Sequence, residues 1–142
     1  MPAPAGDPCA DCQASPPVFA GATAALRYAF PVDAAIRRMK FHRRLEYAPV
    51  FGRLLAARSD GRLDRVDALV PVPLNWQRQF SRGYNQALEI CRPLAAASGI
   101  PVLTGIRRVQ ATPYQSGLPA SARSANVAGA FRAPRRIDAR HV

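Results

Sequence analysis

The pattern of apolar side chains along the chain predicts strands at three places. Residues 23–30 (TAALRYAF) place Leu26 and Tyr28 on one face, with the period of two that is typical of a half-buried strand. Residues 66–72 (VDALVPV) form a nearly continuous apolar run, as expected of a strand buried on both faces of a parallel sheet. We expect a further short strand at residues 101–103.

Two helices are predicted between the first and second strands. Asp33 is placed to cap the first helix, in which Ile36 and Met39 continue the apolar face. Pro49 suits the first turn of the second helix, which the sequence SDG at residues 59–61 ends. Because strands and helices alternate along the chain, the pattern predicts an α/β fold with a parallel sheet.

A third helix follows the buried strand and contains a proline. Its apolar face has the spacing i, i+3, i+4, i+7 and i+8 and consists of Ala87, Ile90, Cys91, Leu94 and Ala95. Pro93 removes one hydrogen bond and crowds the preceding turn, so we expect a kink or an early stop near Arg92. Residues 112–126 are polar and have no clear period, which predicts a mobile loop.

Length and composition predict one domain with a short appendage. The 142 residues, 49% of them hydrophobic, are enough for one core of ordinary size. There is no apolar run of 18 residues or more, and the first residues show neither a basic nor an apolar signal region, so a cytoplasmic location is expected. Residues 1–17 are rich in proline and are predicted to be a tail.

The charge of the chain favours a partner that carries phosphate. Twenty basic residues against nine acidic ones give a net charge of +11, and nineteen of the twenty are arginine. The planar guanidinium group suits bidentate contacts with phosphate or carboxylate. An alternative is that the arginine content reflects a composition bias and that most of these side chains lie on a solvated surface.

The residues best suited to bind phosphate are concentrated in positions 70–86, between the predicted buried strand and the third helix. Gly83 permits close approach of an anion to main-chain N–H groups at the helix start, and Arg78 and Arg82 can add charge-assisted hydrogen bonds. This arrangement predicts a phosphate site.

Aromatic residues alternate with these arginines and suggest a second kind of ligand. Trp76, Phe80 and Tyr84 could stack on the bases of single-stranded nucleic acid. The alternative is that these rings pack the loop. Cys91 lies on the apolar helix face, where a buried thiol is the ordinary outcome.

The same residues resemble a known family. The sequence VPVPL at residues 70–74, then Arg78, then RGYNQA at residues 82–87 is similar to proteins of the competence protein F (ComF) family, which look like type I phosphoribosyltransferases. Tyr28 and the sequence IRRMKF at residues 36–41 match upstream. The downstream pattern matches at Arg108, Thr112, Gln115, Arg123, Asn126 and Phe131.

The resemblance implies a fold and a binding site. The expected fold is the amino-terminal part of a phosphoribosyltransferase-like parallel sheet. The loop at residues 75–86 would bind the pyrophosphate end of phosphoribosyl pyrophosphate, with Mg²⁺ bridging the phosphates. Its implied binding residues are Arg78, Arg82, Gly83, Tyr84, Asn85 and Gln86. Gln115 and Arg123 would belong to a hood loop that closes over the ligand.

The most diagnostic family motif is absent from this sequence. That motif is a strand ending in two acidic residues and a Thr- and Gly-rich turn for the ribose phosphate, and it would begin just after His141 and Val142. Residues 18–142 are therefore interpreted as an incomplete phosphoribosyltransferase-like domain. Without the missing strand, the sheet edge beside residues 66–72 is expected to be exposed and to favour self-association.

The amino-terminal cysteines resemble half of a metal site. Cys9 and Cys12 are similar to the second of two CxxC pairs with which family members commonly begin, so residues 1–17 are interpreted as a zinc-knuckle remnant. A closed structural zinc site has four ligands, so two cysteines predict weak zinc binding. A redox-active or inert CxxC pair is the alternative.

Three functional hypotheses follow from the sequence. The first is a phosphoribosyltransferase-like protein that binds phosphoribosyl pyrophosphate or a related phosphate ligand and is linked to DNA uptake. The second is a non-catalytic basic module that binds single-stranded DNA. The third is a fragment that is inactive alone.

Overall fold

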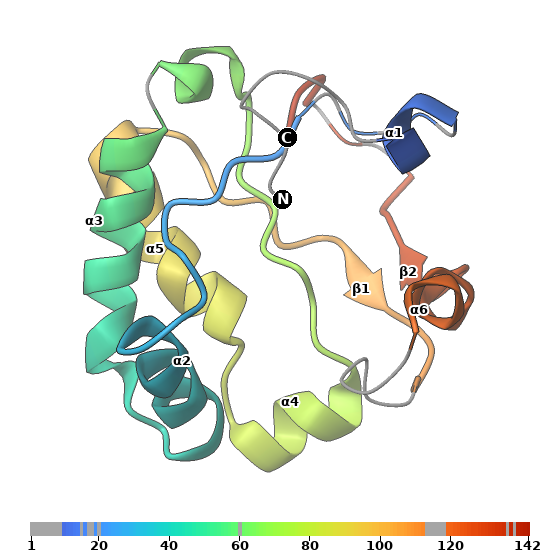
Figure 1. Ribbon diagram of the computed structural model, residues 1–142, viewed down its shortest axis with the longest axis horizontal. Coiled ribbons are helices and arrows are strands. Elements are labelled where there is room, and N and C mark those ends of the chain that lie inside the picture. Colours follow the sequence, from blue (N-terminus) through green and yellow to red (C-terminus); the bar gives the residue numbers. More distant parts are fainter. Residues whose placement is uncertain are drawn as a thin grey trace.

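The computed structural model describes residues 10–14, 16, 19, 21–59, 61–112, 119–135, 137 and 139–142. For residues 11, 12, 120, 121, 123 and 124 it describes the backbone alone. The elements in chain order are α1 (Ala10–Ala14), α2 (Val32–Phe41), the 3₁₀ helix η1 (Leu45–Tyr47), α3 (Ala48–Arg58), the 3₁₀ helix η2 (Arg62–Arg65), α4 (Trp76–Arg82), α5 (Gln86–Ser98), β1 (Arg107–Arg108), α6 (Ala120–Val127) and β2 (Phe131–Arg132) (Figure 1).

The three helices predicted from apolar spacing are confirmed as α2, α3 and α5. Helix α3 has a proline in its first turn as expected, and it ends at Ser59, whose hydroxyl donates to the Leu55 carbonyl at 2.6 Å. The predicted cap of α2 is wrong. Asp33 lies inside the first turn, where it pairs with Arg37 at 2.5 Å, and Pro31 occupies the N-cap position without a side-chain cap.

Of the two expectations for Pro93, a kink or an early stop near Arg92, the early stop is wrong, because α5 continues through Pro93 to Ser98. Gly52 of α3 lies against the proline ring, and its lack of a side chain lets the two helices pack closely at this point. Packing of α5 on α3 therefore offsets the hydrogen bond that the proline removes.

In the described part of the chain, the core consists of two clusters of buried residues. Met39, Ala48 and Phe51 form the first cluster, where α2 and α3 meet. The second cluster joins α5 to the segments that follow η2 and α5, through Leu69, Leu94 and Ile100. The buried segment around residue 69 is thus held against α5.

The predicted strand at residues 23–30 is not formed. The chain there consists of bends and irregular backbone, and Phe30 is 86% exposed. An alternating pattern gives a strand only where a neighbouring strand accepts its hydrogen bonds, and none of the described strands pairs with this segment.

In the predicted buried strand at residues 66–72, Ala68, Leu69 and Pro71 are buried, whereas Asp67 and Val72 are exposed. These residues, which keep the name buried run below, make an isolated parallel bridge between Leu69 and Val102. The Leu69 N–H donates to the Pro101 carbonyl and the Leu103 N–H donates to the Leu69 carbonyl, both at 2.9 Å. Prolines at positions 71, 73 and 101 have no N–H to donate, which keeps this ladder short.

The regular sheet in the described part of the chain is antiparallel and two-stranded. In it Arg107 of β1 lies opposite Arg132 of β2, and Arg108 lies opposite Phe131. The broad α/β expectation is confirmed, whereas the sheet that the structure assigns is not the parallel one that the sequence predicted. The Asp67 N–H donates to the His141 carbonyl at 2.9 Å, so the segment at residues 140–142 lies beside the buried run. Self-association through that edge stays a prediction.

Three α-helices of the described residues were missed by the sequence pattern, and the first is α1, which lies within the predicted amino-terminal tail. Helix α6 begins within residues 112–126, for which a loop was predicted, and extends one residue beyond them; residues 113–118 of that stretch lie outside the described residues. Helix α4 occupies the polar stretch after the buried run. None of the helices that the structure describes is long and apolar enough to cross a membrane.

Candidate phosphate and nucleic-acid site

The corner between α4 and α5 is fixed by three residues of the predicted phosphate loop. The Asn75 side chain accepts the Arg78 N–H at 2.9 Å and caps α4, which ends at Gly83 with a φ of 79° in the left-handed region. Asn85 caps α5 by accepting the Ala87 N–H at 3.0 Å. Its amide also donates to the carbonyl of Val72 at 3.0 Å, so it ties the corner to the buried run.

Tyr84 and Gln86 also face the protein. The Tyr84 hydroxyl donates to the carbonyl of Met39, one of the last four carbonyls of α2, which have no donor within that helix. The Gln86 side-chain nitrogen is buried without a hydrogen-bond partner. Within the predicted phosphate loop, Gly83, Tyr84 and Asn85 thus have contacts that hold α2, α4 and α5 together.

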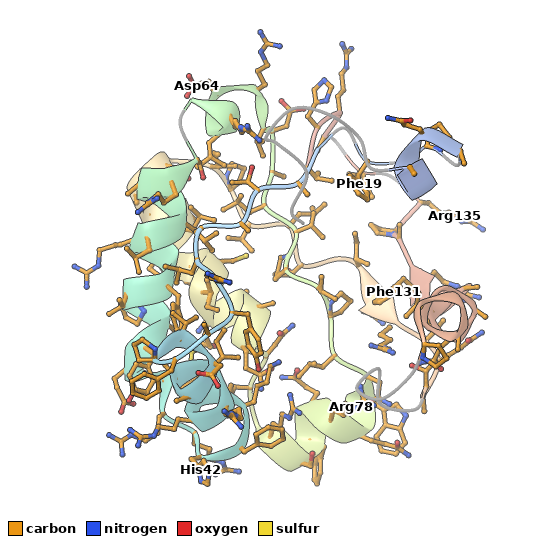
Figure 2. The ribbon with its side chains drawn as sticks, viewed as in Figure 1. Phe19, His42, Asp64, Arg78, Phe131 and Arg135 are labelled. Carbon is orange, nitrogen blue, oxygen red and sulfur yellow. The ribbon has the colours of Figure 1, made fainter. Side chains whose placement is uncertain are left out.

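Arg78 extends from α4 toward the segment that follows β1 (Figure 2). Its guanidinium group donates to the Thr112 carbonyl at 3.0 Å, while Arg108 donates to the hydroxyl of the same Thr112. Two guanidinium groups that are 30 positions apart in the sequence therefore converge on one residue.

Arg108 is the more enclosed of this pair of arginines. Its Nε is buried without a hydrogen-bond partner, and its guanidinium carbon lies 5.4 Å from the centroid of the Phe131 ring. Burial, and secondarily the positive charge of Arg78, lower the pKa of Arg108. The lowered pKa means that the surroundings disfavour the charged form, which a bound anion would stabilise.

Arg82 points to a different element. Its guanidinium carbon lies 5.5 Å from the centroid of the Phe41 ring at the end of α2, which is within cation–π distance. The two arginines that the sequence assigned to one site therefore contact different neighbours, Arg78 near β1 and Arg82 near α2.

The other predicted site residues are described in part or not at all. Gln115 and Cys9 lie outside the described residues, and the side chains of Arg123 in α6 and Cys12 in α1 are not described. Elsewhere in the described ranges, no group of three or more His, Cys, Asp or Glu side chains is arranged to hold a metal ion.

Sequence reasoning missed Phe41 as a member of this region. The signal was present, because Phe41 lies off the apolar face that Val32, Ile36 and Met39 define on α2. An aromatic residue outside the core face of a helix is free to serve a surface role. Its contact with Arg82, 41 positions later, required the tertiary structure.

Comparison with known proteins gives relatives but no structural template. No protein-family profile and no solved structure matches the chain. The DNA utilization protein YhgH of Salmonella typhimurium is 35% identical over 142 residues, and that of Escherichia coli (strain K12) is 34% identical; both matches cover 95% of this chain. Competence protein F of Haemophilus influenzae is 33% identical over 129 residues, which cover 87% of this chain.

The chain is shorter than these proteins, spanning 62% of the length of the two YhgH proteins and 56% of competence protein F. The similarity nevertheless extends over nearly all of the chain, including the corner between α4 and α5. These relatives support the assignment of the chain to the competence protein F (ComF) family.

Proposed function

We propose that this chain acts in the uptake or use of DNA and binds phosphoribosyl pyrophosphate or a related phosphate ligand beside α4. The relatives are named for DNA utilization and for competence, and they match this chain along nearly its whole length. Because those relatives are longer, the proposal concerns the part of the binding site that this chain supplies.

The observation that carries the phosphate proposal is the convergence of Arg78 and Arg108 on Thr112. Two guanidinium groups held close together repel each other, and an anion bound between them would remove that cost. Arginine also binds phosphate through two parallel N–H donors, so the pair suits a diphosphate.

The course of the main chain supports a phosphoribosyltransferase-like arrangement. The parallel bridge between Leu69 and Val102 has the direction that such a sheet requires, and α4 follows the carboxyl end of the buried run. Ligands of open parallel sheets bind outside the carboxyl ends of the strands. Arg78 and Asn75 lie at that end, which favours the proposed site.

The metal ions that the family resemblance implies would need ligands other than Arg78 and Arg108. Mg²⁺ prefers carboxylate and phosphate oxygens, and Arg78, Arg108 and Thr112 offer it only a hydroxyl and a carbonyl. Mg²⁺ would therefore be held chiefly by the phosphates of the ligand. Cys9 and Cys12 would supply two thiolates to a zinc ion, which needs two further ligands.

The chemistry proposed for the arginines is stabilisation of negative charge. If the ligand loses pyrophosphate, Arg78 and Arg108 would bind the departing oxygens and lower the barrier electrostatically. The chain offers no residue that we can assign as the base for an acceptor, so phosphate binding is the part of the activity that we propose.

Calorimetry with Mg²⁺ and either pyrophosphate or phosphoribosyl pyrophosphate tests the proposal. Both ligands should bind with similar affinity, because this pair of arginines recognises the diphosphate. Arg78→Ala and Arg108→Ala should each weaken binding roughly tenfold or more, as expected for hydrogen bonds to a charged group. Arg58→Ala, in the last turn of α3, is the matched control. No heat of binding, or equal binding by all variants, would contradict the proposal.

A second candidate function is binding of single-stranded DNA. The observation that favours it is the exposure of Trp76 and Phe80 on α4 in a chain of net charge +11. Such binding should weaken steeply as salt rises, because neutralised phosphates release counterions. Binding of phosphoribosyl pyrophosphate, which depends on Mg²⁺, should saturate at one ligand per chain.

A further inference from the structure

The carboxyl end of α2 and helix α4 lie at the same end of the molecule (Figure 1). Tyr84 lies just beyond the end of α4, and its hydroxyl donates to the Met39 carbonyl in the last turn of α2. The Arg82 guanidinium carbon, at the end of α4, lies 5.5 Å from the centroid of the Phe41 ring. These two contacts join the end of α2 to the end of α4.

Three large aromatic side chains at this end of the molecule are exposed to solvent. Phe41 is 63% exposed, Trp76 is 72% exposed and Phe80 is 89% exposed. Trp76 and Phe80 are four residues apart in α4, so they lie on the same side of that helix. None of the three belongs to a core cluster of the described residues, so packing of the core does not account for them.

A basic hollow lies at the carboxyl end of α2. Arg38, His42 and Arg44 line a hollow of about 390 Å³ that has no carboxylate in its lining. Arg44 is paired with Glu46, whereas the Arg38 guanidinium donates to the Tyr47 hydroxyl at 3.4 Å. His42 follows Phe41 directly in the chain, so the hollow and the Phe41 ring both belong to the end of α2.

We infer that these side chains together bind single-stranded DNA. In this arrangement bases stack on the exposed rings, Arg82 stacks on Phe41 and adds positive charge, and the hollow holds a phosphate group of the strand. We call the set the stacking surface: Phe41, Trp76, Phe80 and Arg82, with Arg38, His42 and Arg44 of the hollow.

The chemistry of the stacking surface favours a single strand over a duplex. Flat aromatic faces can bind only bases whose own faces are free, and duplex bases are already stacked on each other. The surface rests on the second proposed function, binding of DNA, and it assigns that function to named residues. DNA is favoured over RNA because the relatives are named for DNA utilization.

The single tryptophan of the chain gives a direct measurement of stacking. Trp76 is that tryptophan, so its fluorescence reports on one position of the surface. Titration with oligothymidylate, longer than a site of roughly 4–16 nucleotides, should quench Trp76 fluorescence in parallel with an increase in anisotropy of a labelled oligonucleotide.

Substitution of the other rings tests the surface without removing the reporter. Phe41→Ala and Phe80→Ala should each weaken binding about 5- to 150-fold, the effect expected from loss of one stacked base. Phe19→Ala should leave affinity unchanged, since Phe19 is also an exposed aromatic residue but lies far from α4 (Figure 2). Circular dichroism verifies that each variant is folded.

The possible results distinguish a wrong assignment of the stacking surface from a failure of DNA binding itself. If the chain binds oligothymidylate without quenching of Trp76, and if Phe41→Ala and Phe80→Ala behave like Phe19→Ala, DNA binding stands and the stacking surface is wrong. If the chain does not bind at low salt, the DNA-binding function itself fails. Equal or tighter binding of duplex DNA or of oligouridylate would overturn the preference for single-stranded DNA.

Discussion

The position that a Cβ atom would take on Gly52 lies 2.5 Å from Cγ of Pro93. The same position lies 2.8 Å from the Ile90 carbonyl oxygen, so the backbones of α3 and α5 approach each other closely here. A proline ring in one helix thus fits against a residue without a side chain in the other. This contact helps to place the core that supports the corner between α4 and α5.

Gly52→Ala should therefore destabilise the fold. Within a helix this substitution normally stabilises by up to about 1 kcal/mol, because alanine has the higher helix propensity. Here the added methyl group would overlap Pro93, and overpacking of this kind costs roughly 1–3 kcal/mol. Unfolding in denaturant measures the difference, with Gly21→Ala as control because nothing lies within 4 Å of its Cβ position. A more stable Gly52→Ala chain would contradict the close packing of α3 on α5.

Tyr84→Phe should destabilise the fold, because it weakens the attachment of the end of α2 to the corner between α4 and α5. The lost hydroxyl leaves the Met39 carbonyl without the hydrogen bond from Tyr84, and removal of one such bond costs about 1 kcal/mol. Tyr28→Phe is the control, because Tyr28 is exposed. Equal stability of both variants in denaturant would mean that the Tyr84 bond contributes nothing to the fold.

The three long helices could be predicted from the sequence because their information is local. The apolar residues of α2, α3 and α5 recur at helical spacing, and Pro49 marks the start of α3. Helices α4 and α6 are short and largely polar, so periodicity gave no signal for them. Asn75 and Gly83, which cap and end α4, were the local signals that could have located it.

The strands depended on information that the sequence pattern does not carry. The alternation at residues 23–30 predicts a strand only if a partner lies beside it, and the fold provides none among the described residues. The partners of β1 and β2 are 23 to 25 positions apart, and neither strand has a long apolar run. Pairing of such short strands is determined by tertiary packing.

The sequence predicts the candidate site only as a region of the chain, and its binding role stays a prediction. Arg78 and Arg82 were expected in one loop between a strand and a helix, which suggested a shared ligand. Their contacts, Thr112 and Phe41, lie 34 and 41 positions away and come from opposite directions in the sequence. Long arginine side chains can reach either way from a helix, so the helix alone does not determine their partners.

Cys91 should react slowly with thiol reagents in the folded chain. Burial raises the pKa of its thiol, so less of it is the reactive thiolate at a given pH. A chain with Cys9→Ser and Cys12→Ser leaves Cys91 as the single thiol. Its rate of reaction with a disulfide reagent at mildly alkaline pH should rise when the chain is unfolded in urea. Equal rates in the two states would show that the thiol is accessible and ordinary.

The Asp67 carboxylate should make the stability of the chain depend on pH. One of its oxygens accepts the main-chain N–H groups of Arg140 at 2.8 Å and His141 at 3.0 Å. These two hydrogen bonds, that from Arg140 first, lower the pKa of Asp67 in the folded state. A carboxyl group whose pKa is lower when folded stabilises the fold above its unfolded pKa, near 3.9. That stabilisation is lost as the pH falls through the lower folded value.

Asp67→Ala is the variant that isolates this effect. The substitution removes the acceptor, so the variant should be less stable than the unaltered chain at neutral pH. This difference in stability should shrink as the pH falls below about 4. Urea unfolding at a series of pH values measures both chains, with Asp64→Ala in η2 as the control for loss of one exposed carboxylate. A stability difference that stays constant from neutral to acid pH would show that the ionised Asp67 does not hold residues 140 and 141 beside the buried run.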